Sequence, residues 1–333
     1  MSEFKREKDV LNAHHHALAE GADAGSVFAR DAKLHGAMPI GEIAGGAGIA
    51  LLWARLRRAL PDMERRDLLS LAGRNLPDAR VEVARAARIH ASMAVLQGTF
   101  REPLFGIPPT GGVVSLRICE AHVLERGLIR ESWFMPDFLD LMRQAGVWPL
   151  GRSLGAEGAW QSPKTGAATH AGAEDTAAMD LVLKMHAALL AFDGVSLDSM
   201  PHADYWTSDF MWYGPAGIGT TRGLEGFRAH HQIPFLRAFP DRKGAGHYIR
   251  VSDGDFAVTG GWPSVTATHA GPFLGLPPTQ RSVSMRVMDF YRTENGRIAE
   301  NWVPIDIPHL MQQMGLDVFD RMAELIGARR RML

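Results

Sequence analysis

One strand-like segment near the C-terminal end carries an acidic residue among apolar side chains. Every second side chain of a strand points to the same face, and over 283–291 that face carries Val283, Met285, Val287, Asp289 and Tyr291. An ionised carboxylate is costly in an apolar interior, so burial can raise its pKa and suit it to general acid or base chemistry. The alternative is a structural salt bridge or a polar residue at the end of a barrel, because structural ion pairs also perturb pKa values.

A second candidate for proton chemistry lies at the end of the preceding strand-like run. His269 opens the loop 270–281, where an imidazole could donate a hydrogen bond to a developing oxyanion or move a proton near neutral pH. The alternative role of this histidine is to anchor the loop. For an isolated histidine that alternative would be preferred, and the catalytic role of His269 gains support from Asp289 on the next strand.

The elements that position these residues occur twice in the chain. Pro103–Thr110 matches Pro272–Thr279, and the same offset gives 18 identities over the 44 positions from Pro103 to Gly146. Such self-similarity indicates two copies of one structural unit. Glu120 then corresponds to Asp289 and Phe100 to His269, so one copy keeps the acid–base candidates and the other does not.

The order of elements in each copy is helices first and antiparallel strands afterwards, which is typical of an α+β fold. In the second copy we expect helices over 175–192 and 224–239, a strand at 210–213, and strands near 247–252, 256–268, 282–292 and 297–305. Asn295-Gly296 predicts a hairpin turn between the last two. We expect a first domain over 1–150, a linker rich in small residues over 151–174, and a second domain over 175–333.

Composition excludes several classes of protein. The chain has 333 residues, 36 Lys plus Arg against 37 Asp plus Glu, and a net charge of -1, which gives no electrostatic footprint for nucleic acid or for an anionic membrane. No apolar stretch approaches the roughly 18 residues of a spanning helix, and the charged start has no apolar signal core, so we expect a cytoplasmic protein. Cys119, the single cysteine, is expected to be a buried and inert thiol.

Two other motifs are poor candidates for ligand sites. His14, His15 and His16 are consecutive residues on a predicted helix, so they point in different directions and do not form a metal site by themselves. The glycines of 217–223 are spaced one residue too far apart for a dinucleotide loop and have no βαβ unit around them. We therefore expect neither a metal nor a cofactor.

The second copy resembles a known family. The string Thr268-His-Ala-Gly-Pro-Phe-Leu-Gly-Leu-Pro-Pro-Thr279, followed by Met288-Asp-Phe-Tyr-Arg and Asn295-Gly-Arg-Ile-Ala-Glu-Asn-Trp302, is similar to the SnoaL-like polyketide and ester cyclases. The resemblance implies two cone-shaped α+β barrels of the nuclear transport factor 2-like type. It also implies His269 and Asp289 as the acid–base pair, and it puts the activity of the first copy, with Phe100 and Glu120, in doubt.

These observations favour an enzyme that removes a C–H proton from a small carbonyl or polyketide-like substrate without a cofactor. Aromatic residues of the second copy could line its cavity for a hydrophobic or aromatic substrate: Trp206, Trp212, Tyr213, Trp262, Tyr291 and Trp302. The alternatives are a hydrolase or isomerase of a small catabolic intermediate, and a binding or assembly module without turnover. We also expect the two copies to pack as an internal pseudo-dimer, with a catalytic cavity in the second copy alone.

Overall fold

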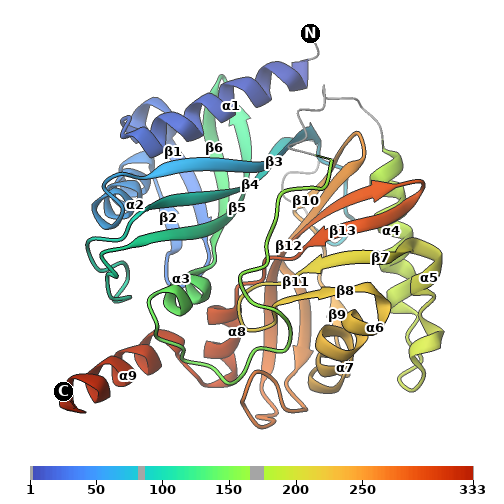
Figure 1. Cartoon of the computed structure of the whole chain (residues 1–333). Coiled ribbons are helices and arrows are strands. Elements are labelled where there is room, and N and C mark those ends of the chain that lie inside the picture. The colour runs from blue at the N-terminus through green and yellow to red at the C-terminus, as the bar shows by residue number, and fades with distance from the viewer. Residues whose placement is uncertain (1–2, 82–86, 166–175, 333) are drawn as a thin grey trace.

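The computed structural model describes residues 3–81, 87–165 and 176–332, which form two α+β halves side by side (Figure 1). Helices precede the long strands in both halves, as the order of sequence patterns predicts. The first half contains α1 (Glu3–Glu20), β1 (Phe28–Gly36), β2 (Gly41–Ala44), α2 (Gly46–Ala59), β3 (Glu64–Arg74), β4 (Arg88–Thr99), β5 (Val113–Glu125), β6 (Leu128–Pro136) and α3 (Phe138–Gln144).

The second half repeats this order with more interruptions. Its helices are α4 (Ala177–Leu190), α5 (His202–Tyr205), α6 (Gly223–Phe227), α7 (Ile233–Ala238), α8 (Ile307–Met314) and α9 (Val318–Met332), with a π-helical turn at Arg228–Gln232 between α6 and α7. Its strands are β7 (Trp206–Tyr213), β8 (Thr220–Arg222), β9 (Lys243–Gly244), β10 (Ile249–Asp253), β11 (Phe256–Thr268), β12 (Ser282–Glu294) and β13 (Arg297–Trp302). Short 3₁₀ turns occur at Ala24–Ser26 and Leu197–Ser199.

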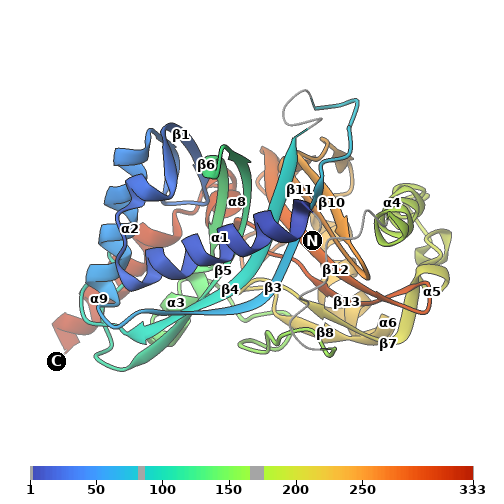
Figure 2. The same cartoon turned by 90° about the horizontal axis from the view of Figure 1, so that it is seen from above.

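Both halves have the same sheet topology. The strand orders are β2-β1-β6-β5-β4-β3 and β8-β7-β13-β12-β11-β10, with β9 also beside β11. Each sheet has one parallel contact, β1 with β6 and β7 with β13, and its other ladders are antiparallel. The helix α1 lies across β3 and β4, whereas α4 lies against β10 to β13 (Figures 1 and 2). The expected α+β class and the duplication are confirmed.

The edge strand differs between the halves. In the first half β3 continues for 11 residues along β4, whereas in the second half it is divided into β9 and β10 with residues 245–248 between them. The neighbouring strand β11 is bulged between Gly261 and Val265 at the same place. A strand that loses its ladder leaves space beside the sheet, and this break forms one wall of the cavity described below.

The two sheets pack face to face through a shared apolar core. Along β12, Val287 belongs to the core on the helix side, whereas Met288 and Phe290 belong to the core between the sheets, as strand alternation requires. Cys119 is buried in this second core, as expected, and burial raises the pKa of its thiol well above the usual value.

Reciprocal hydrogen bonds join the halves around this core. The Asp306 carboxylate accepts from the Met38 N–H at 3.0 Å, and the Asp137 carboxylate accepts from the Ala216 N–H at 3.0 Å. Asp137 aligns with Asp306 in the duplication. Each half therefore uses the equivalent aspartate to accept a hydrogen bond from the equivalent loop of the other half. A reciprocal arrangement of this kind is the signature of a two-fold interface, and the expected internal pseudo-dimer is found.

The segment expected to be a linker is packed where it is described. Trp160 donates from Nε1 to the Gly214 carbonyl at 2.7 Å, and Trp302 donates to the Gln161 carbonyl at 2.9 Å. Residues 166–174 of the expected linker lie outside the described residues. In the part of the chain that is described, no helix is long and apolar enough to cross a membrane.

Candidate active site

A pocket of about 350 Å³ lies between α4 and the broken edge of the second sheet. Its volume is in the range of small-molecule sites. The lining residues come from α4, from residues 244–250, from β11 and β12, and from a loop of the first half: Arg80, Leu183, His186, Ala187, Leu189, Leu190, Gly244, Gly246, His247, Arg250, Ser264, Val265 and Asp289. The pocket therefore has an apolar helical wall and a polar wall.

Asp289 is the carboxylate in this pocket, at the position that strand alternation predicts. Burial raises the pKa of Asp289 to about 7, and a hydrogen bond from the Asn301 side chain opposes the shift only partly. A carboxyl group with a pKa near 7 is divided between its acid and base forms at neutral pH. Such a group can accept a proton and release it again within one catalytic cycle.

Two histidines line the pocket together with Asp289, and one of them contacts a tyrosine of β12. His186 Nε2 and the Tyr291 hydroxyl are hydrogen-bonded at 2.9 Å, and the rings of His186 and His247 lie 5.4 Å apart. Burial is the main cause that lowers the pKa of His186 to about 3 and that of His247 to about 4, so both imidazoles are neutral at pH 7. Burial and the neighbouring Asp289 raise the pKa of Tyr291 well above 10, so its phenol stays protonated. The pocket thus combines one carboxylate with neutral hydrogen-bond donors.

Glu120, the first-half counterpart of Asp289, has a different environment. Its Oε1 lies 2.6 Å from Nη1 of Arg65 and accepts a hydrogen bond from Ser92 at 3.1 Å. Although burial opposes ionisation, the charge of Arg65 leads the effects that hold the pKa of Glu120 well below its usual range. This carboxylate is a fixed anion in an ion pair.

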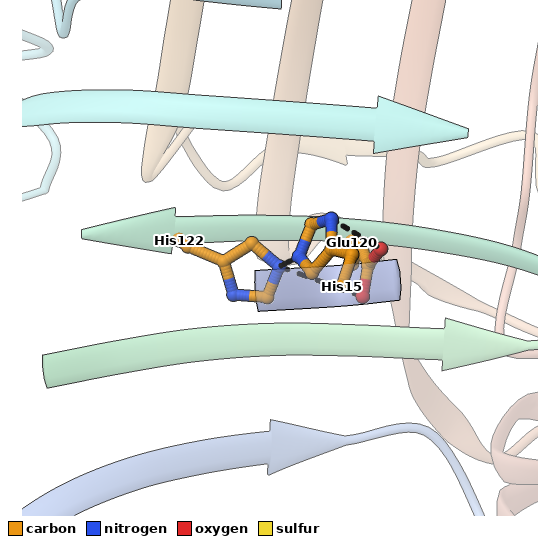
Figure 3. A group of neighbouring side chains, drawn as sticks. All are labelled: His15, Glu120 and His122. Carbon is orange, nitrogen blue, oxygen red and sulfur yellow. Dashed lines mark hydrogen bonds and ion pairs between the residues drawn. The ribbon is translucent and has the colours of Figure 1, made fainter. Parts of the chain in front are cut away.

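Side chains around Glu120 also form the one candidate metal-ligand group among the described residues. Ligand atoms of His15, Glu120 and His122 all lie within 4.8 Å of one another, and Figure 3 shows His15 from α1 meeting the two side chains from β5. His15 and His122 face each other through Nε2 at 3.0 Å. Arg65 lies on the same carboxylate at 2.6 Å and compensates its charge. His14 and His16 point elsewhere, to the Gly127 carbonyl and to Asp67.

The register explains why the second half has a pocket where the first has an ion pair. Arg65 pairs with Leu96 across β3 and β4, and Gly244 pairs with Val265 across β9 and β11. Leu96 and Val265 are aligned in the duplication, so Gly244 is the counterpart of Arg65. Where the first half has a guanidinium on its carboxylate, the second half has no side chain, and Asp289 remains unpaired beside the pocket.

The structure does not bring His269 to Asp289, which corrects the expected pair. The backbone N–H of His269 donates to the Arg281 carbonyl, and seven residues of β12, roughly 25 Å of extended strand, separate Arg281 from Asp289. His269 is fully buried, and its Nδ1 lies 3.0 Å from the Thr279 hydroxyl, so it anchors the loop 270–281. Phe100 is its structural equivalent, since its N–H bonds to Gly112 in the same way.

None of the six expected aromatic residues is among those that line the pocket. Tyr213, Trp262 and Trp302 lie in or against the core between the sheets. Trp206 and Trp212 pack in the core around Phe227, and Trp212 stacks on His231 with ring centroids 4.0 Å apart. Tyr291 comes closest in role, because it contacts the lining residue His186. Sequence patterns show which aromatic residues are buried, but not which of two cores buries them.

Five polar residues of the pocket were not anticipated from the sequence as site residues: Arg80, His186, His247, Arg250 and Ser264. His186 lies on α4 where His15 lies on α1, and each contacts the residue two places after the carboxylate, Tyr291 or His122. The correspondence between the two helices could therefore have identified His186 as a site residue from the sequence. His247 lies in the broken edge strand and Arg80 in the other half, so both depend on tertiary structure that periodicity does not reveal.

A family model described as SnoaL-like polyketide cyclase matches residues 8–145 and again 185–314. The chain belongs to the SnoaL-like polyketide cyclase family. No match is found among curated proteins. Among solved structures, IdmH from Streptomyces antibioticus is 20% identical, with 43% of this chain and 99% of that chain covered and a TM-score of 0.33. TsrD from Streptomyces laurentii is 23% identical, with 41% and 96% covered and a TM-score of 0.33. The double match agrees with the two halves of the fold.

Proposed function

We propose that the second-half cavity catalyses proton removal from a carbon next to a carbonyl group, as in an enolisation, an aldol-type ring closure or an isomerisation. Asp289 is the general base. The observation that carries the proposal is that Asp289 is half-buried, has no ion-pair partner among the described residues and has its pKa raised to about 7, whereas its counterpart Glu120 is held as an anion by Arg65.

In the first step the C–H bond breaks, its proton goes to the Asp289 carboxylate, and its electron pair moves to the carbonyl oxygen to form an enolate. The neutral pair of His186 and Tyr291 supplies the hydrogen-bond donor for this oxygen, a role that preorganised neutral donors perform well in a dry site. This assignment replaces His269, which lies outside the pocket.

In the second step the enolate can react in two ways. When its carbon attacks a second carbonyl carbon of the same substrate, a ring closes, and the protonated Asp289 returns its proton to the oxygen that gains the electron pair. When the protonated Asp289 instead returns its proton to another carbon of the enolate, the product is an isomer. Family membership favours the cyclase and isomerase class, and the apolar wall of Leu183, Leu189 and Leu190 favours an apolar or aromatic substrate body.

Hydrogen–deuterium exchange tests the first step without knowledge of the natural product. The full chain is incubated in D₂O with a panel of aromatic β-keto compounds, and loss of the C–H signal is followed by NMR. We expect catalysed exchange that falls by roughly two to four orders of magnitude in Asp289→Asn, the usual contribution of a general base. Binding of panel members with no catalysed exchange would instead identify a binding module and overturn the proposal.

A further inference from the structure

The polar wall of the cavity contains two guanidinium groups from different halves of the molecule. Arg250 lies on β10, where Ile249 and Val251 point into the core between the sheets and Arg250 therefore points the other way, to the cavity. Arg80 belongs to the loop that follows β3 in the first half. The site of the second half is thus completed by a residue of the first.

Side chains of this loop form hydrogen bonds with backbone groups of residues 247–250. Asn75 donates from its side chain to the Tyr248 carbonyl at 2.6 Å and accepts from the Arg250 N–H at 2.8 Å. The Asp78 carboxylate accepts from the His247 N–H at 3.1 Å. Because these contacts anchor the loop on both sides of the cavity edge, Arg80 has a defined place in the wall.

Each guanidinium keeps a face turned to the cavity. Arg80 uses Nε and Nη2 to bind Asp78 at 3.0 and 2.8 Å, which turns its Nη1 toward Gly244, where an added Cβ would lie 3.0 Å away. Arg250 donates from Nη1 to the Pro77 carbonyl at 2.7 Å, while its buried Nε has no hydrogen-bond partner among the described residues. An unpartnered buried donor of this kind is costly unless a ligand satisfies it.

The charges of this wall do not cancel. Within the described residues, Asp78 is the acid that ion-pairs with Arg80, and no acid pairs with Arg250. His186 and His247 are neutral, so the described residues of this wall, Asp289 apart, carry one more positive than negative charge. Arg250 pairs with Thr259 across β10 and β11, and Thr259 pairs with Asp289 across β11 and β12, so the arginine and the base lie two strands apart on one face of the sheet. The cavity is therefore polarised, with a cationic end and a base at another point of its wall.

We propose that this cavity takes a substrate with a carboxylate group, which Arg250 and Arg80 bind while Asp289 faces the reacting carbon. The inference rests on the proposed function in taking this pocket as the substrate site. A single surplus charge matches a carboxylate better than a phosphate dianion, and planar guanidinium groups bind carboxylates through paired hydrogen bonds. The apolar wall from α4 fits the remainder of an aromatic acid.

A matched pair of probes tests the subsite. 2-Naphthoate and its uncharged analogue 2-naphthamide are titrated into the full chain by isothermal calorimetry, with 1-naphthyl phosphate as a third ligand. We expect the carboxylate to bind at least tenfold more tightly than the amide and more tightly than the phosphate. Arg250→Gln and Arg80→Gln should each weaken naphthoate binding by roughly tenfold to a hundredfold, with little change for the amide. Arg222→Gln, which removes an exposed arginine of the same half, is the control.

Equal affinity for naphthoate and naphthamide, or a loss in Arg222→Gln as large as in Arg250→Gln, would overturn the proposal. If Arg80→Gln does not fold, Arg80→Lys keeps the charge without the paired geometry and should still bind naphthoate more weakly than the wild type. Asp289→Asn separates the two proposals, since it should keep naphthoate binding. Charge-dependent binding with no catalysed exchange would support the carboxylate subsite and contradict the proposed proton removal. Catalysed exchange without charge-dependent binding would support the proton removal and contradict the subsite.

Discussion

At the scale of single residues, the two halves give the same position opposite electrostatic roles. Glu120 and Asp289 occupy equivalent points of β5 and β12, on the face that packs under the N-terminal helix. Arg65 makes Glu120 a permanent anion, and Gly244 leaves Asp289 without a cation. Since a pKa near neutrality requires a carboxylate that is buried but unpaired, one arginine-to-glycine difference separates a structural ion pair from a candidate base.

The ion pair makes a prediction about stability. Glu120→Gln leaves the fully buried Arg65 with only Asp67 as an acidic partner, so the free energy of unfolding should fall by roughly 3 kcal/mol, as loss of one partner of a buried pair costs. Urea unfolding measures this change. The matched control is Glu64→Gln, whose exposed pair with Arg66 should contribute less than about 1 kcal/mol. Equal losses in both variants would show that Glu120 is not an essential partner of Arg65.

At the scale of elements, the sequence predicted the features that follow from periodic patterns of apolar and polar residues. The positions of β11 and β12, the hairpin turn at Asn295-Gly296 and the inward direction of Asp289 all follow from alternation and turn chemistry. The position of His269 relative to Asp289 does not follow from periodicity. The family motif places His269 next to the correct strand but does not show how far along that strand it lies from Asp289. The divided edge strand was also unpredictable, since only the paired partners show that β9 and β10 continue one path.

The divided strand supports a prediction on the cavity itself. Gly244→Arg restores the side chain that the first half has at this position, so it should fill the pocket, lower the pKa of Asp289 and reduce catalysed exchange by at least tenfold. Gly226→Arg is the control, because it adds the same side chain on α6, outside the pocket, where an added Cβ meets only Thr221 at 3.9 Å. Exchange that survives in Gly244→Arg would mean that the substrate binds somewhere else.

At the scale of the whole molecule, the two copies of the duplicated unit share one apolar interface. Each half exposes one apolar sheet face to the other, and α9 of the second half reaches the first, where Phe319 packs on Phe138 with ring centroids 6.4 Å apart. Separate chains of residues 1–150 and 151–333 should therefore associate or aggregate, which size-exclusion chromatography with light scattering will show. Two halves that stay monomeric, with unfolding midpoints equal to that of the whole chain, would contradict this interface.

The two halves share a fold but make different contributions to the candidate active site. The first half supplies the wall residue Arg80 and the packing surface, and the second supplies the base. We therefore expect one active cavity in a molecule with two similar folds. Glu120→Gln should reduce stability and leave catalysed exchange nearly unchanged at a temperature where the variant is folded.

The pH dependence of catalysed exchange, kcat/KM for one responsive β-keto compound, tests the central claim most directly. A base must be deprotonated to act, so the rate should be low in acid, rise through the pKa of Asp289 at about 7 and level off above it. The same curve should appear in Glu120→Gln and be absent in Asp289→Asn. A rate that is already at its plateau at pH 5, or a curve lost in Glu120→Gln and kept in Asp289→Asn, would contradict Asp289 as the base.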